Sequence, residues 1–279
     1  MIIDENLKQA VDYSEGQKTA AYMVLVEIVN LLNEFEDHIR IIGGWVPTLL
    51  YPESEHIGSI DVDVLLNQLE IKNSESYLTI KRILMKNGYV RHPEKYFTFV
   101  KSVEIQGISY DVDVDFLSGK YGGDGGNVSK HVDGIRALPA TGGNFAFEFP
   151  PINVKIEYTR PDGAFDVGHV KVISIVPYLV MKAMALGRGK PKDAYDIYCT
   201  INNYHGGIKA LAEEFIPYVS KKLIQDMKEK LQEKFASVDH AGPVDIISFM
   251  GLIDEEEVAR IKQDAYQKIN YLVNKLNNQ

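Results

Sequence analysis

The sequence lacks the features of an extracellular or membrane-spanning protein. Cys199 is the only cysteine among 279 residues, which excludes an intramolecular disulfide framework and favours a reducing compartment. No run of about 18 apolar residues is present, although a membrane-spanning helix needs one. The first seven residues carry two acids and no apolar segment typical of a signal peptide. Together these absences predict a cytoplasmic protein.

An excess of basic residues is also missing. Lys and Arg number 30 against 39 for Asp and Glu, so the net charge is −9 and the pI is near 5.3. Affinity for a phosphate backbone depends on clustered Lys and Arg, so any contact with nucleic acid would need a local basic patch. The composition, 45% hydrophobic and 25% charged, is that of a globular protein with one large or two modest domains.

The hydrophobic pattern changes along the chain and predicts an α+β protein. The predicted helices cover residues 5–37, 45–50 and 76–87, and the predicted strands cover 39–42, 59–66, 96–105, 108–117, 152–158 and 167–173. The Gln106-Gly107 pair between two of these strands is typical of a hairpin. After residue 173 the pattern is almost wholly helical, so we predict an α/β domain over 1–173 and a helical domain over 174–279. We make no prediction for residues 127–150.

Alternating acids mark two of the predicted strands. Asp61 and Asp63 are two residues apart, so both carboxylates point to one face, where each raises the pKa of the other unless a cation separates them. Such hard oxygen ligands suit Mg²⁺. Asp111, Asp113 and Asp115 alternate with apolar residues on a later strand and offer the third carboxylate that a two-metal site needs. The competing interpretation of the Asp61/Asp63 pair is two solvated acids on an exposed face.

Two further features are suited to phosphate. Gly43-Gly44 lies between a predicted strand and a predicted helix, where glycine allows close backbone approach and the helix start offers N–H donors. Lys182, Arg188, Lys190 and Lys192 form a basic segment in an acidic chain and could neutralise a triphosphate. An ordinary tight turn and a solvated helix end are the alternatives that the residues leave open.

In this order, the motifs resemble the nucleotidyltransferase (polymerase-beta-like) superfamily. The glycine turn and the acidic strand read IIGGW and DVDV. More narrowly, GGWVPTLL, HIGSIDVDVLL and KAMALGRGKPKDAYDIY are similar to the AbiEii/AbiGii toxin family, over about residues 39–207. The resemblance implies a nucleotidyltransferase-like mixed β-sheet with flanking helices, followed by an all-helical carboxy-terminal portion.

The resemblance also implies roles for individual residues. Asp61 and Asp63 would bind Mg²⁺, with two ions expected, and Asp115 would orient and help deprotonate the attacking hydroxyl, with Asp113 as a close competitor for that role. The residues implied in nucleotide binding are Gly43, Gly44, Ser59, Lys182, Arg188, Lys192 and Asp193. Of these, Lys182 would lie near phosphate and carry a catalytic role.

The implied activity is Mg²⁺-dependent transfer of a nucleoside monophosphate from a triphosphate to a hydroxyl acceptor, with release of pyrophosphate. The acceptor would be tRNA if the protein is a type IV toxin, and a cognate antitoxin is then expected. No membrane partner is expected. A small-molecule acceptor, as in antibiotic nucleotidyltransferases, is the first alternative. A non-catalytic nucleotide-binding protein on the same fold is the second, since fold does not fix function.

Overall fold

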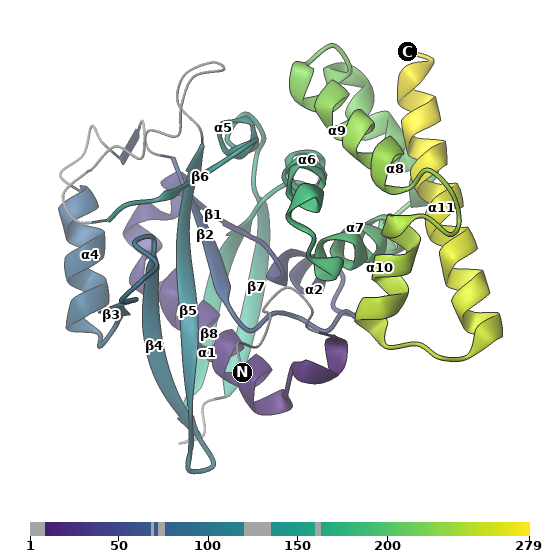
Figure 1. The fold of residues 1–279 in the computed structure, drawn as a ribbon. Coiled ribbons are helices and arrows are strands. Elements are labelled where there is room, and N and C mark those ends of the chain that lie inside the picture. The colour runs from purple at the N-terminus through teal and green to yellow at the C-terminus, as the bar shows by residue number, and fades with distance from the viewer. Residues whose placement is uncertain (1–8, 68–69, 72–75, 120–134, 160–162) are drawn as a thin grey trace. The chain divides into compact units, whose positions relative to one another are not determined.

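The computed structural model describes residues 9–67, 70–71, 76–119, 135–159 and 163–279. Within it the chain divides into two compact units (Figure 1). The first, here called the sheet unit, comprises Ser14–Leu50 and Gly58–Pro177. The second, the helical unit, comprises Tyr51–Ile57 and Tyr178–Gln279, together with residues 9–13. The predicted α+β class with a helical carboxy-terminal region is confirmed.

The sheet unit contains a mixed, open β-sheet. In the described residues it has eight strands in the order β3-β4-β5-β2-β1-β8-β7, and β6 pairs with β5 outside this path. The β5–β2, β1–β8 and β5–β6 pairs are parallel and the other pairs are antiparallel. The strands are β1 (Ile39–Ile42), β2 (Val62–Leu66), β3 (Val90–Arg91), β4 (Thr98–Ile105), β5 (Ile108–Gly119), β6 (Leu138–Ala140), β7 (Ile152–Thr159) and β8 (Phe165–Val172).

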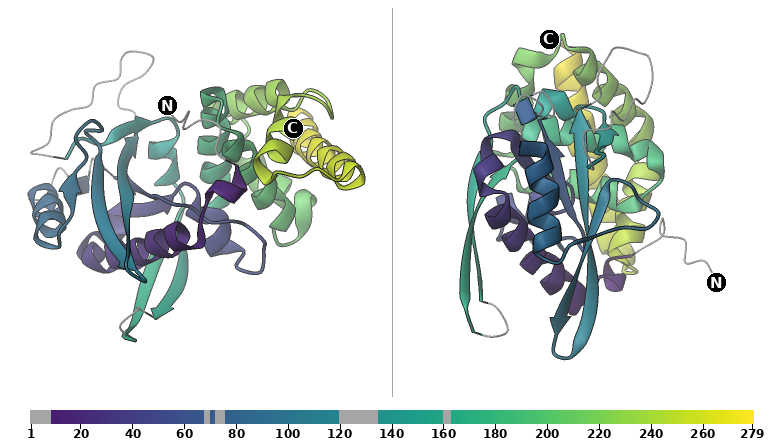
Figure 2. Two further views of the ribbon diagram at one scale, coloured as in Figure 1. Left: turned by 60° about the horizontal axis from the view of Figure 1, so that its bottom comes forward. Right: turned by 90° about the vertical axis from the view of Figure 1, so that its left-hand side faces the viewer.

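Apolar side chains along the central strands form the core of this unit. On β5, Val112, Val114 and Phe116 are buried between exposed or half-buried acids, as expected for a strand with one face in the core. Helix α1 (Glu15–Leu31) covers that face. In the right-hand view of Figure 2, α1 lies between the β4–β5 hairpin and the β7–β8 hairpin.

The first helix is shorter than predicted. The pattern predicts a helix over 5–37, but α1 begins at Glu15 because the Ser14 hydroxyl accepts a hydrogen bond from the backbone N–H of Gln17 and caps it. It ends at Leu31, and a 3₁₀ segment, η3 (Asn33–His38), follows. Residues 5–8 lie outside the described part of the chain.

The predicted hairpin is confirmed. Strands β4 and β5 pair antiparallel down to Ile105 and Ile108, and the two residues between them, Gln106 and Gly107, have φ angles of 52° and 79°. Two successive left-handed residues are the geometry of a type I′ turn, which fits the twist of paired strands. The register of the hairpin therefore follows from this turn.

The helical unit packs its helices around one apolar core. The final helix, α11 (Glu255–Asn277), buries Ile261, Ala265, Ile269 and Leu272 on one face, as its apolar stripe predicts. No helix in the described residues is long and apolar enough to cross a membrane. The remaining helices and 3₁₀ segments of the chain are η2 (Ala10–Asp12), α2 (Trp45–Leu50), α4 (Ser76–Lys86), α5 (Gly143–Ala146), α6 (Ile175–Ala185), η4 (Leu186–Arg188), α7 (Pro191–Asn203), α8 (Gly207–Phe215), η5 (Ile216–Tyr218), α9 (Lys222–Lys234) and α10 (Ala241–Met250).

Candidate active site

The acidic faces of β2 and β5 lie side by side in the sheet. The two strands are parallel neighbours, and Asp63 pairs in register with Asp115. Asp113 shares the face of Asp115 because side chains alternate along a strand. Asp61, the residue just before β2, is close enough for its charge to raise the pKa of Asp115. The structure thus brings together the four carboxylates that the sequence singled out, on the face opposite to α1.

The glycine turn lies directly against one of these carboxylates. Ile42, which pairs with Asp63 across the β1–β2 ladder, is followed by Gly43 with a φ of +74°. A Cβ at this position would lie 1.8 Å from Oδ2 of Asp63. Only glycine therefore allows both the left-handed turn and the close approach of the backbone to the carboxylate. Gly44 follows, and α2 begins at Trp45.

Asp61 is held through both its side chain and its backbone. The Ser59 hydroxyl donates a hydrogen bond to Oδ1 of Asp61 at 2.5 Å. The buried indole of Trp45 donates from Nε1 to the backbone carbonyl of Asp61 at 2.8 Å. Trp45 is consequently a packing residue that fixes the backbone just before β2. Ser59, which the sequence predicts to bind nucleotide, contacts the Asp61 carboxylate.

Asp115 is the carboxylate most altered by its surroundings. Burial, together with the negative charges of Asp61 and Asp113, raises its pKa to about 6. A hydrogen bond from the Thr98 hydroxyl to Oδ1, at 2.5 Å, and the ammonium of Lys95 act in the opposite direction. The raised pKa therefore has burial as its main cause, with repulsion from Asp61 and Asp113 as a smaller one.

Asp113 and Asp111 have different partners. The Lys95 ammonium donates to Oδ2 of Asp113 at 3.0 Å and forms an ion pair with it. Ser102 donates to Oδ1 of Asp111 at 2.5 Å, four residues further along β5 from Asp115. The sequence interpretation missed Thr98, Lys95 and Ser102 as partners of these acids.

The donor set suits a divalent cation by its chemistry. Carboxylate oxygens are the hard ligands that Mg²⁺ prefers, and a cation would offset the repulsion that Asp61 and Asp113 exert on the buried Asp115 carboxylate. Within the described ranges, however, no group of three or more His, Cys, Asp and Glu side chains lies close enough to hold a metal ion. The carboxylates therefore fit Mg²⁺ in type and charge, while their present side-chain positions do not form a closed set of ligands.

The basic segment predicted to bind nucleotide forms ion pairs inside the helical unit. Lys182 of α6 contacts two buried carboxylates of α7, Oδ1 of Asp193 at 2.9 Å and Oδ2 of Asp196 at 2.6 Å. Pro191 begins α7, which suits the first helical position. The spacing within α7 places the two acids one turn apart on the side that meets Lys182.

Three further side chains complete this network. Lys192 contacts Asp196 at 2.8 Å, Arg188 contacts Asp193 at 3.0 Å, and His56 Nε2 lies 2.9 Å from Oδ1 of Asp196. Burial lowers the pKa of His56, so its ring is neutral at pH 7. Three cations therefore face two carboxylates. The Arg188 side chain is 57% exposed and those of Lys182 and Lys192 are 12% and 15% exposed.

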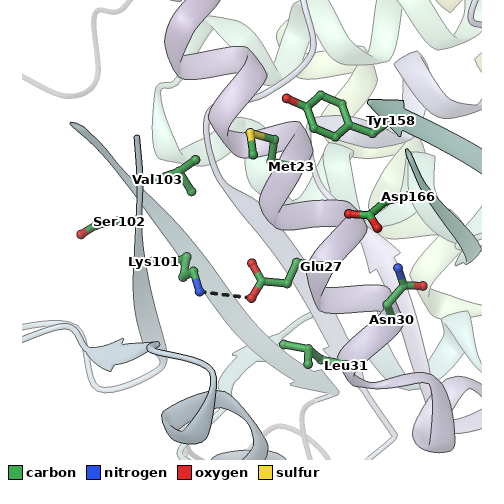
Figure 3. Close-up of a pocket in the computed structure, with 9 residues that line it drawn as sticks. All are labelled: Met23, Glu27, Asn30, Leu31, Lys101, Ser102, Val103, Tyr158 and Asp166. Atoms are coloured by element: carbon green, nitrogen blue, oxygen red, sulfur yellow. Dashed lines mark hydrogen bonds and ion pairs between the residues drawn. The ribbon is translucent and has the colours of Figure 1, made fainter. Parts of the chain in front are cut away.

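A cavity of about 380 Å³ lies elsewhere in the sheet unit (Figure 3). Met23 and Glu27 of α1, Lys101 of β4 and Tyr158 of β7 contribute to its lining, and Lys101 is ion-paired with Glu27 at 3.1 Å. Lys101 pairs with Val112 in the β4–β5 ladder, so its side chain is on the α1 face of the sheet. The sheet itself separates this cavity from the carboxylates.

Comparisons with protein-family models, with curated proteins and with solved structures find no match for this chain.

Proposed function

We propose that the protein is a Mg²⁺-dependent nucleotidyltransferase that moves a nucleoside monophosphate from a nucleoside triphosphate to a hydroxyl acceptor. The observation that carries this proposal is the alignment of Asp63 with Asp115 on adjacent parallel strands, with Gly43 against the Asp63 carboxylate. Three segments distant in sequence supply acids and a glycine turn to neighbouring central strands of the sheet. Such a site suits a reaction in which a charged phosphate must come close to the backbone.

In this proposal the carboxylates have distinct roles. Asp61, Asp63 and Asp115 would hold the metal ions, and Asp115 would also accept the proton of the attacking hydroxyl. A carboxylate whose pKa is about 6 is well matched to proton transfer near neutral pH. Bound Mg²⁺ would supply charge stabilisation to the phosphoryl oxygens. The acceptor oxygen then forms a bond to the α-phosphorus, and pyrophosphate leaves with the electron pair of the broken bond.

The partners of the two β5 acids favour Asp115 over Asp113 as the third carboxylate. Asp113 is ion-paired with Lys95, so its negative charge already has a partner. Asp115 is the residue in register with Asp63, and its contact is a neutral hydroxyl. We therefore propose Asp115 for the proton-accepting role and Asp113 as the residue that holds Lys95.

Within the sheet unit, phosphate binding by Gly43, Gly44 and Ser59 is part of the same proposal. Nucleotide binding by Lys182, Arg188, Lys192 and Asp193 is proposed separately, for the helical unit. The network around Asp193 and Asp196 has three cations and two acids, so one positive charge is left to attract an anion. Arg188 is the exposed member of this network, so we propose that it is the residue that contacts phosphate directly. Lys182 and Lys192 would act from partly buried positions.

The test is incorporation of label from α-³²P-labelled ATP, GTP, CTP and UTP in the presence of Mg²⁺. Total tRNA and a panel of hydroxyl-bearing antibiotics serve as acceptors, and the variants are Asp63→Asn and Asp111→Asn. We expect Asp63→Asn to lose activity by at least about 100-fold, because the charge that binds the metal is removed. Asp111→Asn, a change on the same face of β5 but remote from Asp63, should retain activity.

The acceptor identifies the branch of the superfamily. Transfer to RNA that weakens steeply with added salt supports the toxin-like activity, since RNA affinity depends on phosphate contacts. Transfer to an antibiotic with little dependence on salt supports the resistance-type activity. Nucleotide binding without transfer to either acceptor would contradict the enzyme proposal and favour a nucleotide-binding protein.

A further inference from the structure

Strand β4 presents a buried hydroxyl to the proposed proton acceptor. Thr98 is the first residue of β4 and is directly opposite Asp115 in the antiparallel ladder. Its side chain shares the face of the acids, the residue is 1% exposed, and Oγ1 lies 2.5 Å from Oδ1 of Asp115. A hydroxyl that donates to a carboxylate at this distance makes a strong, charge-assisted hydrogen bond.

We propose that Thr98 is the positioning residue of the site, because its hydroxyl fixes the orientation of the Asp115 carboxylate toward Asp63 and the metal ions. This inference rests on the proposed nucleotidyltransferase function. In this role Thr98 acts through its hydrogen bond to Asp115 and not on the substrate or the metal directly.

The need for such a residue follows from the chemistry of aspartate. The terminal torsion of Asp is broad and roughly two-fold, so the carboxylate plane is poorly fixed by the side chain alone. Thr, in contrast, is β-branched and stiff at χ1, and here it is held in a buried position on a strand. The hydrogen bond from the Thr98 hydroxyl therefore restricts the rotation of the Asp115 carboxylate. Residues in this relation to a metal ligand commonly change affinity or activity by 10- to 100-fold when replaced.

The same hairpin contains an internal comparison. Ser102 and Asp111 form a second hydroxyl–carboxylate pair on the same two strands, also directly opposite each other and also at 2.5 Å. This pair is exposed and is four residues further from Asp63 along β5. If these hydroxyls only stabilised the hairpin, removing the one on Thr98 or the one on Ser102 should have similar effects on Mn²⁺ affinity and kcat. If Thr98 positions Asp115, only its replacement should lower them.

The experiment measures Mn²⁺ affinity by electron paramagnetic resonance and, in parallel, kcat and the KM for nucleotide. The variants of the full chain are Thr98→Val, Thr98→Ser and Ser102→Ala, with Asp115→Asn as the reference for loss of the carboxylate. We expect Thr98→Val to weaken Mn²⁺ binding and to lower kcat by about 10- to 100-fold, with a smaller change in KM. Thr98→Ser should keep the wild-type Mn²⁺ affinity and kcat, because it keeps the hydroxyl. Ser102→Ala should match the wild type in both.

Thermal unfolding of each variant separates positioning from folding. If Thr98→Val does not fold, Thr98→Cys replaces it, because a thiol is similar in size but a weak donor. Thr98→Cys should then have a lower Mn²⁺ affinity and a lower kcat than Thr98→Ser. Wild-type Mn²⁺ affinity and kcat in Thr98→Val, or equal losses in Thr98→Val and Thr98→Ser, would overturn the positioning role. So would a loss in Ser102→Ala as large as that in Thr98→Val.

The two proposals fail in different ways. If the wild type binds Mn²⁺ through Asp115 but transfers no nucleotide, the proposed activity is wrong, and the Mn²⁺ affinities of the Thr98 variants still decide the positioning role. If the wild type binds no Mn²⁺, both proposals are overturned. If transfer is robust and Thr98→Val is unaffected, only the positioning role is lost.

Discussion

At the scale of single residues, the arrangement of acids in the candidate site lowers the stability of the folded protein. Asp61, Asp113 and Asp115 share one region of the sheet unit, and their mutual repulsion, added to burial, raises the pKa of Asp115 to about 6. In an unfolded chain the pKa of Asp is about 3.9. Folding therefore becomes less favourable as the pH rises and the buried carboxyl ionises, as is common where charged groups are gathered for chemistry.

Asp115→Asn should stabilise the metal-free protein above pH 6 and abolish transfer. Between the unfolded pKa and about 6 the native state binds the proton and the unfolded state does not, so the free energy of unfolding falls as the pH rises through this window. The shift corresponds to about 3 kcal/mol at full ionisation. Asparagine does not ionise, so in Asp115→Asn the free energy of unfolding should not fall in this pH window. Urea unfolding from pH 4 to pH 8 in EDTA measures the difference.

Asp111→Asn is the matched control for this measurement. Asp111 is an exposed acid on the same strand, hydrogen-bonded to Ser102, and its replacement should leave the pH dependence as in the wild type. A pH dependence in Asp115→Asn equal to that of the wild type would show that Asp115 does not titrate as the structure implies.

At the scale of elements, α7 depends on a buried ionic network. The Asp196 side chain is 0% exposed and contacts Lys182, Lys192 and His56. The ammonium groups of Lys182 and Lys192 lower its pKa despite burial, so the carboxylate remains charged. The network joins α6 to α7 and also ties the short segment around His56 to α7.

Asp196→Asn should be strongly destabilising. Loss of the carboxylate charge leaves two partly buried ammonium groups without their shared partner, and breaking such a pair costs about 3–5 kcal/mol. Denaturant unfolding of the variant gives the value.

Asp226→Asn supplies the control for α7. Asp226 pairs with the exposed Lys222 on α9, and surface pairs contribute about 0–1 kcal/mol. Similar losses in the two variants would contradict the assignment of the network as a structural element of α7.

At the scale of the whole molecule, the chain passes between the two units more than once. The helical unit takes residues 9–13 and Tyr51–Ile57 in addition to the segment from Tyr178 onward. Tyr13 packs edge-on against Phe249, Tyr51 against His205, and His56 stacks on Tyr195 at a centroid distance of 5.2 Å. The carboxy-terminal segment is therefore not a complete unit by itself.

A fragment of residues 174–279 should be less stable than the same helices in the full chain. It lacks His56, Tyr51 and Tyr13, and it leaves Asp196 without one of its partners. Native-state hydrogen exchange of α7 amides measures the difference. A synthetic peptide of residues 50–58 should restore part of the protection, and the same peptide with His56→Ala should restore less. Equal protection in the fragment and the full chain would contradict this prediction.

Much of the site followed from local sequence. The alternation of Asp111, Asp113 and Asp115 with apolar residues determined their shared face, because side chains alternate along any strand. The Gln106-Gly107 turn determined the register of the hairpin. Counting back from that turn places Thr98 opposite Asp115 and Ser102 opposite Asp111, so both hydroxyl partners were within reach of the sequence and were overlooked.

Other elements had no sufficient local signal. Strands β3 and β6 are two and three residues long, too short to show a period, and α5 has four residues. The first helix was predicted too long because a polar cap at Ser14 was not weighed against the apolar pattern that continues on both sides. Short elements are stabilised mainly by their neighbours, which a local pattern does not contain.

The sequence by itself determined the α+β class, the acidic strand faces, the glycine turn and the helical carboxy-terminal part, since each depends on backbone periodicity or on the allowed angles of one residue. Only the tertiary structure decided that β2 and β5 are parallel neighbours with Asp63 beside Asp115. Only it decided that His56 lies against Asp196 of α7. Strand order and such long-range pairs depend on how separate segments bury their surfaces together, and no local pattern along the chain records that choice.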